Sequence, residues 1–252
     1  MTWSSTLGLI SSIALFLPVF FILLFKLSGY KTFPALMIYY LIVFGYNLST
    51  MKYIDPGDDV TRYWGITNNL LDTPLMLGFL IYFSTSPALN RRIKMVIGLF
   101  LIFELLILIW KGVNVNAITI IMGPGLAIVI GFCLHFFVKH SKAALMNGKT
   151  MGKAIMAAAL VFAYGCYAII YLIHYVFKSS HTDHTFLIYF LVTTFSSLLL
   201  CAGIVIERKR IYKLNEVKTA RKELADIYKD SVGASTFRRG PMLDFDKEPW
   251  KN

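Results

Sequence analysis

The sequence predicts an all-α, polytopic membrane protein: a seven-transmembrane-helix bundle with its N-terminus outside and its C-terminus in the cytoplasm. Three observations lead to this fold class. Hydrophobic residues make up 57% of the 252 residues and charged residues only 15%, a smaller charged share than a soluble domain of this length carries. The apolar residues fall in long blocks, each close to the roughly 20 residues that cross a hydrocarbon core. Lysine and arginine gather in alternate loops between these blocks.

Each apolar block is predicted to be a helix, because a chain in the hydrocarbon core must satisfy its backbone hydrogen bonds within the segment. The alternating segments of about ten residues that build a membrane β-barrel are not seen. The first block has no charged n-region and no obvious cleavage site, so we interpret it as a retained helix rather than a signal peptide. The seven predicted spans are 5–26, 33–50, 66–86, 94–112, 116–138, 152–177 and 185–206.

The positive charges set the predicted orientation. The loops on one side hold nine lysine and arginine residues and those on the other side four, and the tail after Glu207 adds twelve to the richer side. Positive loops stay cytoplasmic, and this distribution requires an odd number of spans. We therefore predict a multi-pass protein of the cytoplasmic (inner) membrane. The net charge of +11 indicates topology and attraction of the basic tail to anionic inner-leaflet lipids, not a nucleic-acid partner.

Three segments are expected along the chain: a seven-helix transmembrane domain at 1–206, a basic amphipathic cytoplasmic helix at 207–230, and a disordered or loosely docked tail at 231–252. Apolar residues recur at helical spacing in the second segment. Gly, Ser, Arg and Pro dominate the third. No kinase or other output domain follows the last helix, so we expect an unknown protein partner to receive any signal.

Two acidic residues stand out because of where they lie. Of the 14 Asp and Glu residues in the chain, only Asp72 and Glu104 fall well inside a predicted span. A charge there costs about 3 kcal/mol or more, so such side chains face protein or water rather than lipid. With a rise of about 1.5 Å per residue, they lie about 9 Å and 12 Å below the outer surface.

Other polar groups are predicted at the same level, so that five or six helices together form a polar pocket open to the outside. Asn68 lies one turn from Asp72 on the same helix face. The Gly-Pro-Gly sequence at 123–125 is expected to break the fifth span and to free backbone carbonyls at this depth. The ligand-binding candidates are Asn47, Asn68, Asn69, Asp72, Thr73, Glu104, Tyr164, Tyr167, Tyr171, His174, Thr193 and Ser197.

Each candidate also has a structural interpretation. Ser, Thr and Asn in membrane helices often bond to their own backbone or to a neighbouring helix. Tyr171 and His174 also fit an interfacial aromatic belt. Asp72 and Glu104 could form a hydrogen-bonded acid pair that shares one proton.

No reaction is predicted. The sequence lacks the H-E-x-x-H, G-x-S-x-G and phosphate-loop motifs. The His-Thr-Asp-His segment at 181–184 is a weak match to a zinc or copper site. The acidic segment at 55–59 reads as a solvated turn rather than a calcium loop. We therefore predict no catalytic residue, no metal site and no enzymatic activity.

The third span resembles the third helix of microbial rhodopsins. It reads N-N-L-L-D-T-P-L-M from Asn68 to Met76, similar to the rhodopsin pattern of a counterion residue followed after a short gap by Thr-Pro-Leu. This resemblance puts Asn68 at the counterion position and Asp72 at a position usually held by a small residue. The Tyr164, Tyr167 and Tyr171 face is likewise similar in kind to the sixth-helix wall of a retinal pocket.

The resemblance fails at the residue that holds the cofactor. Rhodopsins bind retinal through a Schiff-base lysine in the seventh helix, and no lysine occurs between Thr185 and Glu207. Covalent retinal is therefore excluded, and the resemblance implies an opsin-like scaffold with a possible non-covalent ligand.

The leading hypothesis is a non-enzymatic membrane protein that senses or binds a small ligand and signals through a partner. The alternative is a proton-coupled permease or proton relay that uses Asp72 and Glu104. A structural subunit of a membrane complex and an intramembrane lipid-modifying enzyme stay open as further alternatives.

Overall fold

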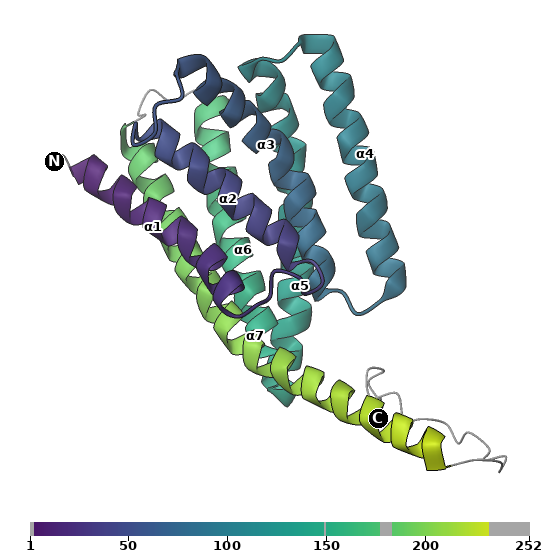
Figure 1. Ribbon diagram of the computed structural model, residues 1–252. Coiled ribbons are helices and arrows are strands. Elements are labelled where there is room, and N and C mark those ends of the chain that lie inside the picture. The colour runs from purple at the N-terminus through teal and green to yellow at the C-terminus, as the bar shows by residue number, and fades with distance from the viewer. Residues whose placement is uncertain (1–2, 149, 177–182, 232–252) are drawn as a thin grey trace. The chain divides into compact units, whose positions relative to one another are not determined.

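A computed structural model describes residues 3–148, 150–176 and 183–231 (Figure 1). These residues contain helices and no strand. The chain divides into two compact units, 1–210 and 211–252, and the helical bundle described below belongs to the first.

Seven long helices and two short helical segments follow one another in the described residues. In order they are α1 (Trp3–Leu24), α2 (Phe33–Thr50), α3 (Asp58–Leu80), the 3₁₀ turn η1 (Ile81–Phe83), α4 (Pro87–Lys111), α5 (Val115–Asn147), α6 (Met151–Tyr171), the π-helical segment η2 (Leu172–Val176) and α7 (Asp183–Ser231). Within the described ranges, six of them are long and apolar enough to cross a membrane, all except α3. The protein is thus a multi-pass helical membrane protein.

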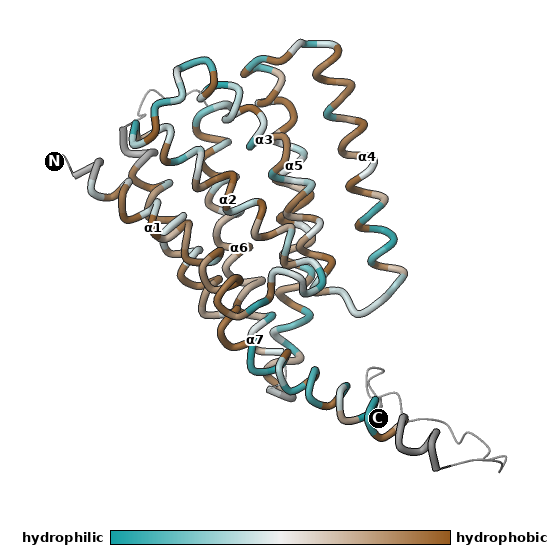
Figure 2. The backbone as a smooth tube through the Cα atoms, in the orientation of Figure 1, coloured by the Kyte–Doolittle hydropathy of each residue, from teal (hydrophilic) through white to brown (hydrophobic). Residues whose placement is uncertain are grey.

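The surface of α4 supports the membrane assignment. Leu99, Leu106, Ile109 and Trp110 are 59%, 61%, 82% and 73% exposed. A soluble protein rarely exposes a continuous apolar surface of this kind, whereas lipid covers it at no cost. Figure 2 shows that hydrophobic residues also line α1 and the first half of α7, and that hydrophilic residues gather where α4 begins.

Helix α3 is more polar than α1, α2, α4, α5 and α6, because Asp58, Asp59 and Arg62 lie in its first turns and Asp72 follows further along. The sequence predicted its span to begin at 66, but the helix begins at Asp58, where negative side chains in the first turn stabilise a helix N-terminus. It packs against α2, α4 and α5. This polar helix therefore lies among three more apolar ones.

Other helix ends also move outward from the predicted limits. Helix α4 begins at Pro87, and proline suits the first turn because its missing N–H has no helical partner there. Helix α5 ends at Asn147. The residue that caps it, Gly148, has a φ of 64°, the left-handed conformation that glycine adopts readily. Helix α7 runs through the segment predicted as a separate helix at 207–230. Of the predicted tail, 232–252 lies outside the described residues.

The predicted break at Gly123-Pro124-Gly125 is wrong: α5 continues through Pro124. The two glycines instead let neighbouring helices approach. A Cβ at Gly125 would collide with Thr73 Oγ1 of α3, and one at Gly123 would lie 2.9 Å from Tyr171 Oη of α6. The segment is thus where α3 and α6 pack closely on α5.

Candidate functional site

The carboxylate of Asp72 is the meeting point of three helices. Tyr164 of α6, which is 1% exposed, donates a hydrogen bond from its hydroxyl to Asp72 Oδ1 over 2.7 Å. Tyr39 of α2 hydrogen-bonds to the same carboxylate. Because charge-assisted bonds of this kind are stronger than neutral ones, they hold α3 firmly to α2 and α6.

A second group of hydrogen-bonded hydroxyls lies between α6 and α7. The ring of Tyr164 lies edge-on to that of Tyr167, with centroids 6.0 Å apart. The hydroxyls of Tyr167 and Thr193 share a hydrogen bond of 3.0 Å, and Tyr189 also bonds to Thr193. We call these six residues the Asp72 network: Tyr39, Asp72, Tyr164, Tyr167, Tyr189 and Thr193.

Glu104 of α4 lies close enough to Asp72 for their charges to interact. It is only 4% exposed, and its Oε1 has no hydrogen-bond partner. A buried acceptor left without a partner costs about 1–3 kcal/mol, and more if it is charged. The two predicted acids therefore share a neighbourhood but differ in environment: tyrosines satisfy Asp72, and Glu104 has an oxygen to spare.

Two further predicted residues carry buried polar atoms without partners. They are Asn68, through Oδ1, and Ser197, through Oγ. The Tyr40 side chain lies beside Ser197, but its geometry does not make a hydrogen bond to the Ser197 hydroxyl oxygen. Buried polar groups are normally hydrogen-bonded, so these atoms and Glu104 Oε1 are exceptions among the described residues.

The remaining predicted residues make contacts outside the Asp72 network. Asn47 donates to Ser12 Oγ over 2.8 Å and ties α2 to α1, and Asn69 donates to the Gly65 carbonyl of its own helix over 2.8 Å. Tyr171 donates to the Thr119 carbonyl of α5 over 3.0 Å. These contacts match the structural interpretation, in which polar side chains bond to their own backbone or to a neighbouring helix.

Thr73 and His174 complete the predicted set. Thr73 is 5% exposed and packs on Gly125. His174 lies in η2, with its ring centroid 6.4 Å from that of Tyr175. Among the described side chains, neither forms a hydrogen bond with a residue of the Asp72 network.

The depth predicted for the acids changes with the helix limits. The estimate placed Asp72 near the outer end of a span that begins at 66. Because α3 begins at Asp58 and ends at Leu80, Asp72 lies nearer the Leu80 end. The network thus lies deeper along α3 than the sequence suggested.

Sequence reasoning missed Tyr39 and Tyr189. Both are tyrosines inside otherwise apolar segments, which is the signal that could have identified them, since a buried phenol requires a hydrogen-bond partner. Which partner each one finds depends on the helices that adjoin it, and helical spacing does not report that.

Metal binding has no support within the described part of the chain, where no three His, Cys, Asp or Glu side chains come together. Part of the predicted weak metal site at 181–184 lies outside the described residues.

No family model matches the chain, and no curated protein or solved structure matches it either. Its function is therefore inferred from its own residues.

Proposed function

We propose that this protein is a non-enzymatic, seven-span membrane protein that binds a small polar ligand beside Asp72 and Glu104 and signals through a partner. The observation that carries the proposal is the contrast between the two acids. Asp72 receives two phenol hydrogen bonds, whereas the neighbouring buried Glu104 has an oxygen with no partner.

The proposal counts α3 as a span. Its 23 residues extend about 35 Å at the usual rise, which is enough to cross a hydrocarbon core. Its charges at Asp58, Asp59 and Arg62 lie at one end, and its one deep charge is hydrogen-bonded by Tyr164. Seven spans then agree with the outside N-terminus and cytoplasmic C-terminus that the loop charges favour.

The ligand chemistry follows from the atoms that need partners. Carbonyl and carboxyl oxygens of Asn68 and Glu104 accept hydrogen bonds, and both are unpaired. A ligand with hydroxyl or amine donors would satisfy them. Such a ligand is consistent with an opsin-like scaffold that binds its ligand non-covalently. A core selected for packing alone would place apolar side chains at such positions instead.

Signalling would pass through α7. This helix contributes Thr193 to the Asp72 network, and its sequence continues into the basic segment at 207–230. We propose that this segment lies at anionic inner-leaflet lipid and contacts the partner protein.

The test is native mass spectrometry of the protein released from mild detergent. We expect a small molecule to remain bound to the wild type and to be lost from the double variant Asp72→Asn/Glu104→Gln. Asn47→Ala is the matched control, because it removes a polar contact outside the network and should keep the ligand. Equal retention in the double variant and the wild type, or no retained molecule in any of them, would overturn the proposal and favour a structural subunit.

A proton relay is the second candidate, and two neighbouring hydroxyl hydrogen bonds favour it, one from Tyr164 to Asp72 and one between Tyr167 and Thr193. In this case Glu104 would exchange its proton with a neighbouring water. Proteoliposomes that acidify under an imposed potential with the wild type, and not with Glu104→Gln, would place this candidate first.

A further inference from the structure

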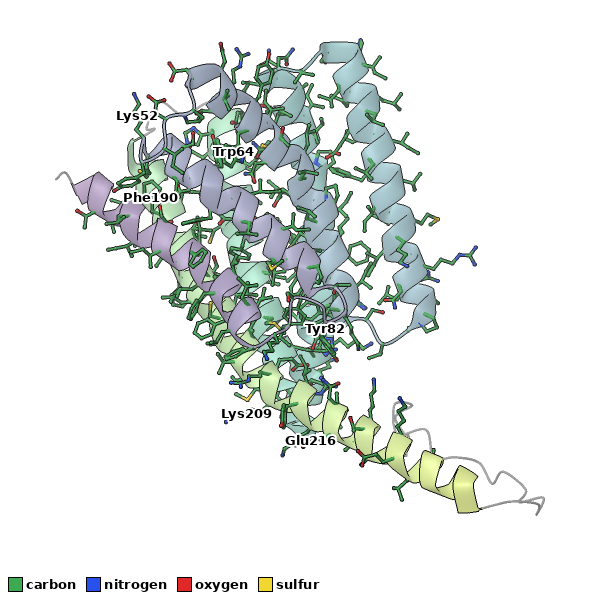
Figure 3. All side chains as sticks on the ribbon, viewed as in Figure 1. Lys52, Trp64, Tyr82, Phe190, Lys209 and Glu216 are labelled. Atoms are coloured by element: carbon green, nitrogen blue, oxygen red, sulfur yellow. The ribbon has the colours of Figure 1, made fainter. Side chains whose placement is uncertain are left out.

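A second buried polar cluster lies where α3 ends and α7 passes it. Tyr82 donates its hydroxyl to Glu207 Oε1 over 2.8 Å. Arg210 Nη1 contacts the same oxygen at 3.0 Å, and Glu207 is only 2% exposed. Figure 3 shows Tyr82 at the end of the bundle opposite Trp64 and Lys52.

Two lysines converge on the same tyrosine. Lys153 of α6 is 6% exposed; its ammonium donates to the Tyr82 carbonyl over 3.1 Å and lies 4.5 Å from the centroid of its ring. Lys31, in the loop before α2, has its Nζ 5.9 Å from that centroid. We call Lys31, Tyr82, Lys153, Glu207 and Arg210 the Tyr82 cluster.

The charges of this cluster do not balance. The cluster holds three cations and one carboxylate, and that carboxylate forms its ion pair with Arg210. Lys139 adds a fourth positive charge nearby, with its ammonium bonded to Thr85 Oγ1 at 3.1 Å. Glu207 is thus the carboxylate that offsets both Lys153 and Arg210, so positive charge is in excess at this end of the bundle, and a buried charge is stable only when it is well paired.

The neighbouring polar groups His140 and Lys153 add no negative charge to the cluster. His140 is 3% exposed, and its Nε2 is occupied by the Phe83 carbonyl at 2.9 Å. Lys153 has three N–H donors and uses one on Tyr82. Lys31 is exposed and the Arg210 side chain is 36% exposed, so the cluster is open to an anion that arrives from the helix ends.

We propose that the Tyr82 cluster binds the phosphate of an anionic phospholipid headgroup, with Lys31 and Lys153 as its principal contacts. Lysine ammonium groups bind phosphate oxygens as point charges, and basic pockets between membrane helices hold anionic headgroups. Headgroups lie where membrane helices end, as α3 does here at Leu80. Because Lys153, Tyr82 and Glu207 come from α6, η1 and α7, the bound phosphate strengthens the contact between these elements.

The experiment uses the full-length chain in nanodiscs of phosphatidylcholine, with or without phosphatidylglycerol. The choline ammonium offsets the phosphate charge of the first lipid, and the second carries a net negative charge. We expect phosphatidylglycerol to raise the thermal midpoint of the wild type and to stay bound in native mass spectra. Lys31→Gln, which changes an exposed loop residue and leaves the bundle packed, should weaken that retention by about tenfold, the loss of one charge-assisted contact.

Lys142→Gln is the matched control, since Lys142 is an exposed lysine of α5 outside the cluster, and it should bind the lipid like the wild type. Lys153→Arg should keep most of the binding and Lys153→Gln should lose it. Equal retention in Lys31→Gln and Lys142→Gln would overturn the site. A midpoint raised equally by inorganic phosphate in pure phosphatidylcholine discs would overturn the assignment to lipid.

Discussion

The Asp72 network and the Tyr82 cluster use the same groups, a buried carboxylate and a tyrosine hydroxyl, in opposite electrostatic settings. At Glu207 the carboxylate has both a phenol and a guanidinium partner, and positive charge is in excess. At Asp72 only phenols bond to the carboxylate, and a second acid lies nearby. The comparison teaches that a buried acid with a counter-charge holds helices together, whereas Glu104, beside Asp72, keeps an oxygen without a protein partner, which is the site we propose for a ligand.

The largest expected effect is the loss of the Glu207 anchor. Glu207→Gln leaves the cations around Tyr82 without their one carboxylate, and breaking a buried ion pair costs about 3–5 kcal/mol. Thermal unfolding in detergent should show a clear fall in the midpoint. Glu216→Gln, an exposed glutamate of the same helix, is the control and should change little. Equal midpoints for the two variants would break the comparison.

The next largest effect on stability is expected where α3 and α5 pack closely, at Gly125. Gly125→Ala places a Cβ against Thr73 Oγ1, so α3 must shift on α5, at a cost of about 1–3 kcal/mol. Gly131→Ala, at a helical position with nothing within 4 Å, should be neutral or slightly stabilising. Unfolding midpoints of the two variants would decide the point, and a neutral Gly125→Ala would contradict the packing described for the acid site.

The bond between Tyr164 and Asp72 should contribute about 1–3 kcal/mol, because it joins a neutral donor to a buried carboxylate. Tyr164→Phe removes only the hydroxyl and should lower the free energy of unfolding by that amount. In Tyr164→Phe/Asp72→Asn the two losses should not add, and a double-mutant cycle measures the coupling. Strict additivity would show that the pair does not interact.

Glu104→Gln should have the smallest effect on stability and still abolish ligand binding. No protein partner is lost at Oε1, and a neutral amide is easier to bury than a carboxylate, so the free energy of unfolding should stay within about 1 kcal/mol or rise. A fall as large as that of Glu207→Gln would show that Glu104 is an anchor too, and the distinction between the two regions would disappear.

The sequence predicted the helical membrane class and named Asp72, Tyr164, Tyr167 and Thr193 among the ligand-binding candidates. Apolar block length and depth along a helix carry that information. Neither reports which helices adjoin, so Tyr39 was missed, although it bonds to the same carboxylate as Tyr164.

Glu207 shows more clearly what the sequence alone does not predict. In the sequence it marks the end of an apolar block beside Arg208, Lys209 and Arg210, which reads as a solvated interface. Its burial depends on Tyr82, which is 125 residues away along the chain. The prediction for the Gly-Pro-Gly segment was wrong for a similar reason. Its glycines leave room for Thr73 and Tyr171, which lie on other helices.

The most direct test is a cryo-electron microscopy map of the wild type in lipid nanodiscs, viewed around Glu104. The proposed function predicts non-protein density within hydrogen-bonding distance of Glu104 Oε1, enclosed by α3 and α4. A Glu104 carboxyl turned toward the acyl chains, or closed in by apolar side chains with no density beside it, would contradict it.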